Sequence, residues 1–109
     1  MDKNVPLTEA VYYILIALRN PNHGYGIIQD INSLTSGRVV LGAGTLYGAI
    51  QSLLERGWIE LVSAQATSRK KKEYSITESG IDALIKEWRR LEELLAHGKL
   101  IDRNSSDFA

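Results

Sequence analysis

Hydrogen-bonding side chains with almost no charge gather on one face of a predicted helix between Leu41 and Ile59. This face carries Thr45, Tyr47, Gly48, Gln51 and Ser52. Short or planar hydrogen-bonding groups of this kind suit the reading of base edges in a DNA groove. The alternative is an ordinary amphipathic helix that uses small residues as a contact face.

Four consecutive cations follow this helix, at Arg69, Lys70, Lys71 and Lys72. They lie at or just after the tip of a predicted two-stranded hairpin, which is formed by the strand-like segments 58–63 and 73–76. A helix followed by a basic hairpin is the layout of a winged helix-turn-helix, in which the wing follows the phosphate backbone. A charge run can also be a solvated face or a lysine-protected strand edge, but its place behind the helix favours phosphate contact.

Other kinds of chemistry find little support. The chain has no cysteine, and its two histidines, His23 and His97, are far apart in sequence. No phosphate-binding glycine loop with a lysine and no catalytic pair of carboxylates occurs, so we predict no enzyme, no cofactor and no metal site. We assign His23 to a helix start. The net charge is zero, but residues 36–76 hold six basic and three acidic side chains, which concentrates positive charge around the helix and hairpin.

Two further predicted helices precede the candidate recognition helix. The first starts after Thr8, its N-cap, and is apolar on every side, so one face needs a layer beyond the domain's own core. A turn over residues 20–22 leads to the second helix, which starts at His23. The stripes that we expect to be buried are Ile27, Ile31 and Leu34 on the second helix and Leu46, Ile50, Leu53 and Leu54 on the third. Thr45 is expected to cap or open the third helix, and Gly57 to end it.

The last helix, predicted over residues 77–97 with Thr77 as its N-cap, carries large apolar side chains at spacings of three and four. A helix that packs on its own domain would show the same pattern. Three helices and the hairpin already fill the core, however, so we predict a homodimer in which this helix packs against its mate and the mate's first helix. The predicted interface comprises Val11, Ile14, Ile81, Leu84, Trp88, Leu91 and Leu95, with Ile85 and Leu94 widening the stripe. Charged residues are assigned to the other faces, at Glu87, Arg89, Arg90, Glu92 and Glu93.

The predicted fold is mostly α with a small β-hairpin, a winged helix-turn-helix plus a C-terminal dimerisation helix. The DNA-binding domain is expected over residues 1–76, the dimerisation helix over 77–97 and a flexible tail over 98–109. No apolar run reaches the length of a membrane span and no signal peptide pattern occurs, so we expect a cytoplasmic protein with no membrane partner.

The chain resembles the PadR-type transcriptional regulators through five motifs that occur in the family's order and cover roughly residues 7–95. They are Leu7-Thr8-Glu9-Ala10, His23-Gly24-Tyr25-Gly26-Ile27, the segment 44–50, the segment 53–59, and Tyr74-Ser75-Ile76-Thr77-Glu78-Ser79-Gly80. The resemblance implies a dimeric winged-helix repressor, and the single C-terminal helix resembles the short branch of the family. Family members often have proline at the position of Gly48, where glycine lets the helix approach DNA more closely.

The predicted DNA contacts fall into three groups. By resemblance, Tyr47 and its helix neighbours enter the major groove, and the wing lysines lie along phosphates or the minor groove. From the residues themselves, we assign base or sugar contacts to Thr45, Tyr47 and Gln51, backbone positioning to His23, Tyr25 and Arg38, and electrostatic attraction to Arg69, Lys70, Lys71 and Lys72. The Tyr47 hydroxyl could instead cap a core position, but Leu46 already takes the core direction, so we place Tyr47 outward.

Some relatives sense small aromatic or drug-like molecules in a cavity between the dimer's helices. Trp88 in mid-stripe, with Tyr12, Tyr13 and Ile16, could form flat apolar walls for such a ligand. Packed dimer core is the alternative role for Trp88, and we expect no buried acid or base in the stripe. The sequence thus predicts a homodimeric repressor of a pseudo-palindromic operator, with a small aromatic effector as a candidate ligand. A winged-helix adaptor that binds protein instead of DNA is the competing function.

Overall fold

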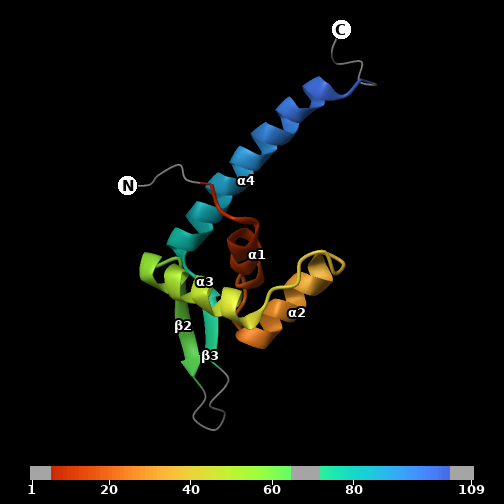
Figure 1. Ribbon diagram of the computed structural model, residues 1–109. Coiled ribbons are helices and arrows are strands. Elements are labelled where there is room, and N and C mark those ends of the chain that lie inside the picture. Colours follow the sequence, from red (N-terminus) through yellow and green to blue (C-terminus); the bar gives the residue numbers. More distant parts are fainter. Residues whose placement is uncertain (1–5, 65–71, 104–109) are drawn as a thin grey trace.

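The computed structural model of the chain describes residues 6–64 and 72–103. Three helices, α1 (Glu9–Ala17), α2 (Gly24–Leu34) and α3 (Ala43–Arg56), pack beside a small sheet, and the long α4 (Glu78–Gly98) leads away from them (Figure 1). The sheet consists of β1 (Asn22–His23), β2 (Ile59–Ala64) and β3 (Lys72–Ile76), and a 3-10 turn, η1 (Lys99–Ile101), follows α4. This mostly helical, winged layout confirms the predicted fold class.

One stripe of each short helix builds the core. The buried apolar side chains are Ile14, Leu15, Ala17 and Leu18 at α1, Ile27 and Ile31 on α2, Leu46, Ile50 and Leu53 on α3, and Ile59 and Tyr74 in the sheet. Two predicted core positions are wrong, because Leu34 is 59% and Leu54 is 39% exposed. Leu34 ends α2, and Leu54 lies about 100° around α3 from Leu53, so both side chains turn away from the core.

The sheet has three strands in the order β1-β3-β2 rather than the predicted two. Asn22, which we expected in a turn, is extended and pairs with Tyr74, while His23 pairs with Glu73. A two-residue strand is too short to produce an alternating sequence pattern, which is why the sequence did not indicate it. The third strand places the start of α2 directly beside the wing.

The end of α3 and the start of α4 are fastened together. Gly57 has the left-handed φ of 75° that ends α3, as predicted, and the Trp58 N–H donates to the Leu53 carbonyl oxygen at 3.0 Å. The Thr77 hydroxyl donates to the Gly57 carbonyl oxygen and accepts from the Gly80 N–H, which confirms Thr77 as the N-cap of α4. A Cβ on Gly80 would overlap the Trp58 carbonyl oxygen, so this junction requires glycine.

The start of α3 differs from the prediction. Gly42 is the N-cap, in an extended conformation, and its carbonyl oxygen accepts from the Leu46 N–H at 3.0 Å. Thr45 is therefore the third residue of the helix rather than its cap. This earlier start adds Ala43 and Gly44 to the helical surface.

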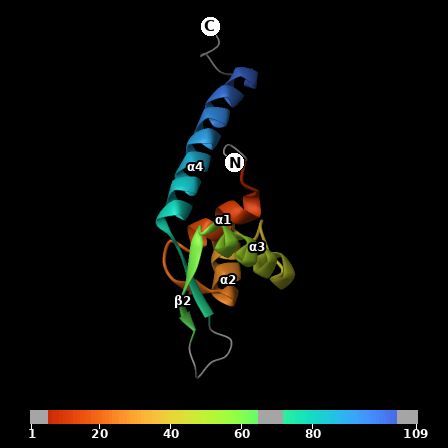
Figure 2. The ribbon, with the colours of Figure 1, turned by 90° about the vertical axis from the view of Figure 1, so that its left-hand side faces the viewer.

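The C-terminal helix leaves the domain as a single long rod (Figure 2). Its bounds, Glu78–Gly98, differ from the predicted ones by one residue at each end. In the predicted tail, Gly98 ends α4 and Lys99–Ile101 form η1, while residues 104–109 lie outside the described part of the chain. None of the helices in the described ranges is long and apolar enough to cross a membrane.

Candidate DNA interface

From its start to its middle, the exposed side of α3 is formed mainly by small and uncharged residues, and the charged Glu55 and Arg56 are exposed at its end. Ala43, Gly44, Thr45, Tyr47, Gly48, Gln51 and Ser52, which we call the outer face of α3, are all exposed. Apart from the neighbouring residues and backbone of the helix itself, no atom of the described residues lies within 4 Å of the place where a Cβ would stand at Gly44 or Gly48. Because Leu46, Ile50 and Leu53 hold the opposite side in the core, the helix presents a shallow surface with hydrogen-bonding groups at its edges.

Tyr47 combines the two roles that the sequence left open. Its side chain is 51% exposed on the outer face, yet its hydroxyl lies against Gly24 at the start of α2. A Cβ on Gly24 would overlap the hydroxyl oxygen and lie 2.8 Å from Cζ of the ring. Burial, with a smaller contribution from Tyr47, raises the pKa of Tyr74 in β3. Tyr47 thus stands where α3, α2 and the wing meet.

The start of α2 is a closely packed turn. His23 caps the helix, since its Nδ1 accepts from the Gly26 N–H at 3.3 Å, which confirms the predicted helix-start role. Asn22 Oδ1 accepts from the His23 N–H and its Nδ2 donates to Asp30 Oδ2, each at 2.9 Å. A Cβ on Gly26 would overlap Asn22 Oδ1. The positioning roles of Asn22 and both glycines were missed, although the glycine spacing in His23-Gly24-Tyr25-Gly26 is their sequence signal.

Three predicted contact residues therefore come together around Gly24. His23 and Tyr25 flank it in sequence, and Tyr47 reaches it from α3. Tyr25 is exposed, and His23 is half-buried by its capping role. Their common position lies at the edge of the outer face of α3, where a nucleic-acid backbone would pass if the face entered a groove.

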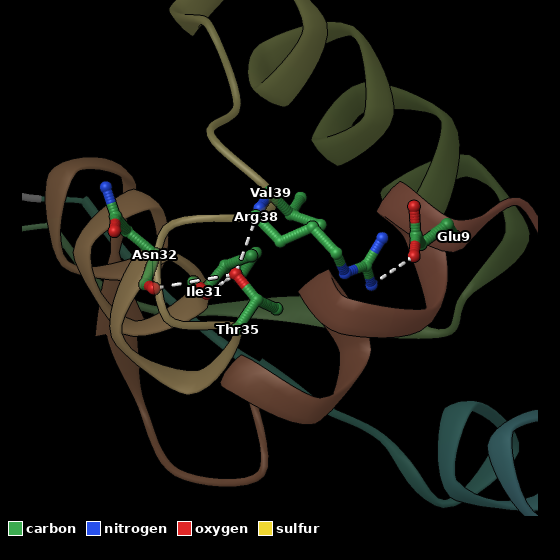
Figure 3. A network of polar contacts seen from close by, with 6 residues as sticks. All are labelled: Glu9, Ile31, Asn32, Thr35, Arg38 and Val39. Carbon is green, nitrogen blue, oxygen red and sulfur yellow. Dashed lines mark hydrogen bonds and ion pairs between the residues drawn. The ribbon is translucent and has the colours of Figure 1, made fainter.

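Arg38 does not join this group. Its guanidinium forms an ion pair with Glu9 at the start of α1 (Figure 3). Hydrogen bonding with Glu9, and with Tyr13, raises the pKa of the Arg38 guanidinium. Figure 3 also shows Thr35 closing this turn, with its hydroxyl donating to the Ile31 carbonyl oxygen and accepting from the Val39 N–H. The Arg38 side chain is nevertheless 60% exposed, and its backbone-positioning role stays a prediction.

The cationic cluster lies mostly beyond the described residues. Arg69, Lys70 and Lys71 fall outside them, whereas Lys72 is exposed at the first position of β3. Within the described ranges, no group of three or more His, Cys, Asp or Glu residues could hold a metal ion.

The α4 helix exposes a row of large apolar residues, the α4 stripe, made of Ile81, Ile85, Trp88, Leu91, Leu94 and Leu95. Leu84 differs from these because it packs against the domain's own core. Ile14 is fully buried within its own chain and has no surface to offer, so its place in the predicted interface is wrong. Val11 is half-buried, and the exposed Leu100 and Ile101 extend the apolar surface beyond the prediction.

Glu87 corrects one expectation. We assigned it to the charged faces of the helix outside the stripe, but Glu87 is only 6% exposed. The backbone N–H of Leu7 reaches its carboxylate from a distant part of the chain, a partner that helical periodicity cannot reveal. Trp88, the next residue on the helix, is half exposed.

The tyrosines predicted to line a ligand site have different neighbours. Tyr12 and Tyr13 meet edge to face, with ring centroids 6.1 Å apart, and both are half-buried, as is Ile16. Burial, and then the charge of Glu87, raises the pKa of Tyr12, whereas Tyr13 interacts with Arg38. Tyr12 therefore faces α4, and Tyr13 faces the turn before α3.

A winged domain with an exposed third helix has the layout of the winged helix-turn-helix proteins that bind DNA. Residues 14–86 match the Transcriptional regulator PadR-like family, and an uncharacterized Lysinibacillus sphaericus protein is 30% identical over 84 residues, covering 73% of this chain and 77% of that protein. The chain belongs to the PadR-like family of transcriptional regulators. This assignment also confirms the prediction of a protein that is not an enzyme.

Two solved structures show how far the likeness extends. A PadR family transcriptional regulator from Eggerthella lenta is 26% identical with a TM-score of 0.71, covering 85% of this chain and 81% of that one. Bacillus subtilis PadR in complex with operator DNA is also 26% identical, with a TM-score of 0.64, covering 74% of this chain and 47% of that one. The shared part thus includes most of the present chain but less than half of the Bacillus protein.

Proposed function

We propose that this regulator is a homodimeric repressor that recognises a pseudo-palindromic DNA operator. The observation that carries the proposal is the outer face of α3, which is exposed, uncharged and open in front of Gly44 and Gly48. A face without bulky or charged groups can lie close to the floor of the major groove. The operator-bound structure of the similar Bacillus subtilis protein supports the same use of the fold.

The proposed contacts divide by chemistry. Thr45, Tyr47 and Gln51 read bases or sugars, while His23 and Tyr25 position the backbone. Arg69, Lys70, Lys71 and Lys72 attract phosphates. Arg38, which is exposed beside Glu9, would also position the backbone.

The second copy would cover the α4 stripe. Full burial of a large apolar side chain is worth about 1.5–3 kcal/mol, so leaving this row in water is costly. We propose an interface of Val11, Ile81, Leu84, Trp88, Leu91 and Leu95, with residues 77–97 as the dimerisation helix and 1–76 as the DNA-binding part. A small aromatic effector that binds to Tyr12, Tyr13, Ile16 and Trp88 would cause the protein to dissociate from its operator. We place the protein in the cytoplasm.

Binding to the gene's own upstream DNA, against random DNA of equal length and at several salt concentrations, tests the proposal. If each wing neutralises about three phosphates, log affinity should fall with log salt at a slope of roughly −5. Gln51→Ala should reduce the preference for the upstream fragment, whereas Glu55→Ala, a change of an exposed residue on the same helix, should retain it. Weak binding to every DNA, without salt dependence, would contradict the proposal and favour the adaptor that binds protein.

A further inference from the structure

We propose that Glu87 is a positioning residue that fixes the angle at which α4 leaves the winged domain. In the proposed dimer, this angle sets the separation of the two α3 helices and so the operator spacing that the protein accepts. The second step rests on the proposed function, whereas the first concerns a single chain.

The Glu87 carboxylate is held from two sides. The backbone N–H of Leu7, just before the N-cap of α1, donates to Oε2 at 3.2 Å. Arg90 donates through Nε to Oε1 at 2.8 Å and through Nη2 to Oε2 at 2.7 Å. The Glu87 side chain thus links α4 to the residue before α1, while two hydrogen bonds from Arg90 hold it on its own helix.

The position of Glu87 along α4 gives this contact its importance. Gly80 is fixed against Trp58 and Leu84 packs on the core, so the first turns of the helix have their own anchors. Glu87 is the last buried residue of α4, and every described residue from Leu91 onward is exposed. The helix beyond Glu87 is therefore an arm that its own domain does not support (Figure 2).

The length of this arm makes its angle matter. The eleven-residue step from Glu87 to Gly98 corresponds to roughly 16 Å at 1.5 Å per residue. A change of about 10° at Glu87 would displace the far end by roughly 3 Å, which approaches the 3.4 Å spacing of one base pair along DNA. Small changes at the anchor thus become changes of register at the operator.

A carboxylate suits this role better than an apolar side chain. Apolar contacts are not directional, so a leucine in the same place would allow the helix to rotate and slide. Hydrogen bonds to a charged carboxylate weaken when their angles change, and the paired bonds from Arg90 add geometric specificity. The two bonds from Arg90 hold the carboxylate in one orientation on α4, and the bond from Leu7 ties this fixed group to the start of α1.

Distance measurements between two spin labels test the first step without DNA. Because the chain has no cysteine, labels can be placed at Glu55→Cys on α3 and Glu93→Cys on α4, both exposed positions. Doubly labelled protein is mixed with excess unlabelled protein, so that only distances within one chain are observed. Circular dichroism checks that each variant retains its helices.

We expect a narrow distance distribution with Glu87 present and one at least about twice as wide with Glu87→Ala, because the last anchor is lost. Glu87→Gln keeps an acceptor for Leu7 but loses the charge that pairs with Arg90, so its distribution should be intermediate. Glu92→Ala, which removes an exposed carboxylate from the same helix, should leave the distribution unchanged. Equal widths in all four proteins would overturn the positioning role.

Operator fragments whose half-sites are moved by one base pair test the second step. The parent protein should prefer one spacing by about tenfold, since avidity is lost when both sites cannot be reached together. Glu87→Ala should reduce this preference to about threefold or less without changing affinity for a single half-site. If the variant kept the full preference, the inference would be wrong. If the parent protein bound no operator, the proposed function would fail, while the label distances would still decide the role of Glu87.

Discussion

The outer face of α3 and the α4 stripe are both exposed helix surfaces, but their chemistry differs. The outer face of α3 consists of glycine, hydroxyl, phenol and amide groups, whereas the α4 stripe consists of Trp, Leu and Ile side chains. Helices that needed only solubility would carry charge in both places. The contrast is consistent with the two proposed partners, DNA at the outer face of α3 and a second copy of the chain at the α4 stripe.

The two surfaces are also held in place differently. The lack of a side chain at Gly24 lets Tyr47 of α3 lie against the start of α2, whereas directional bonds at Glu87 set the direction of α4. A change at the first support should alter how DNA is read, and a change at the second should alter how two copies are spaced.

Trp88→Glu should have the largest effect because it places a charge in the middle of the α4 stripe. We expect a monomer that keeps its fold, since Trp88 is half exposed within one chain. Operator affinity should fall by more than about 100-fold as the advantage of two linked sites is lost. Sedimentation and operator titration measure the two effects. Ser79→Glu adds the same charge at an exposed position near the start of α4 and should change neither the oligomeric state nor the operator affinity. If Trp88→Glu remained a dimer, the α4 stripe would not be the interface.

Gly24→Ala should have the next largest effect, on the α3 side of the comparison. Its Cβ overlaps the Tyr47 hydroxyl, and such overpacking costs about 1–3 kcal/mol. Tyr47→Phe removes the overlapping oxygen and leaves Cζ at 2.8 Å, so the double variant should recover part of the lost stability. Urea unfolding of the four proteins measures this coupling. Strictly additive losses would mean that Gly24 and Tyr47 do not depend on each other.

Local sequence patterns predicted the helices, their caps and most of the core. The features that they did not predict depend mainly on contacts between residues that are far apart in sequence. The caps at Thr8, Gly57 and Thr77 and the core stripes could be predicted because each depends on neighbours within a few positions. The Arg38 partner Glu9 is 29 residues away, and the Glu87 partner Leu7 is 80 residues away. Charge on a helix is ordinarily read as solvent exposure, so no periodicity could place Glu87 inside.

The candidate site shows the same division. The exposure of Thr45, Tyr47, Gly48, Gln51 and Ser52 followed from the apolar stripe opposite them. The grouping of His23, Tyr25 and Tyr47 around Gly24 did not, because it depends on how α3 crosses the start of α2. Glycines in a motif indicate close approach of the backbone but do not name the residue that approaches.

The Glu87 anchor should also weaken in acid. Hydrogen bonding to Arg90 lowers the pKa of Glu87 despite its burial, so the folded chain favours the charged carboxylate. This contribution to stability is complete above the pKa of the unfolded chain, about 4.3, and is lost as the pH falls through the lower pKa of the folded chain. Glu87→Gln should therefore cost the same at pH values well above about 4.3 and progressively less below it, as measured by chemical unfolding. A cost that does not change with pH would show that the charge of Glu87 is not used; Glu92→Gln serves as the exposed control.

Gly48→Ala should have the smallest effect on folding. It tests whether the outer face of α3 contacts DNA, because it changes that face without disturbing the core or the α4 stripe. Outside the helix itself, no atom in the described part of the chain lies within 4 Å of the new Cβ. Alanine within a helix is more stable than glycine by roughly 0.5–1 kcal/mol, so the free energy of unfolding should rise. If the outer face of α3 lies against base edges, the same methyl group should weaken operator binding several-fold, because it occupies the space that a base would fill. Gly98→Ala, at the last position of α4 and equally unobstructed, should not affect operator binding. A Gly48→Ala protein that is more stable and binds its operator as tightly as before would mean that this part of α3 does not approach DNA closely, and base reading would then have to lie nearer Tyr47 and the wing.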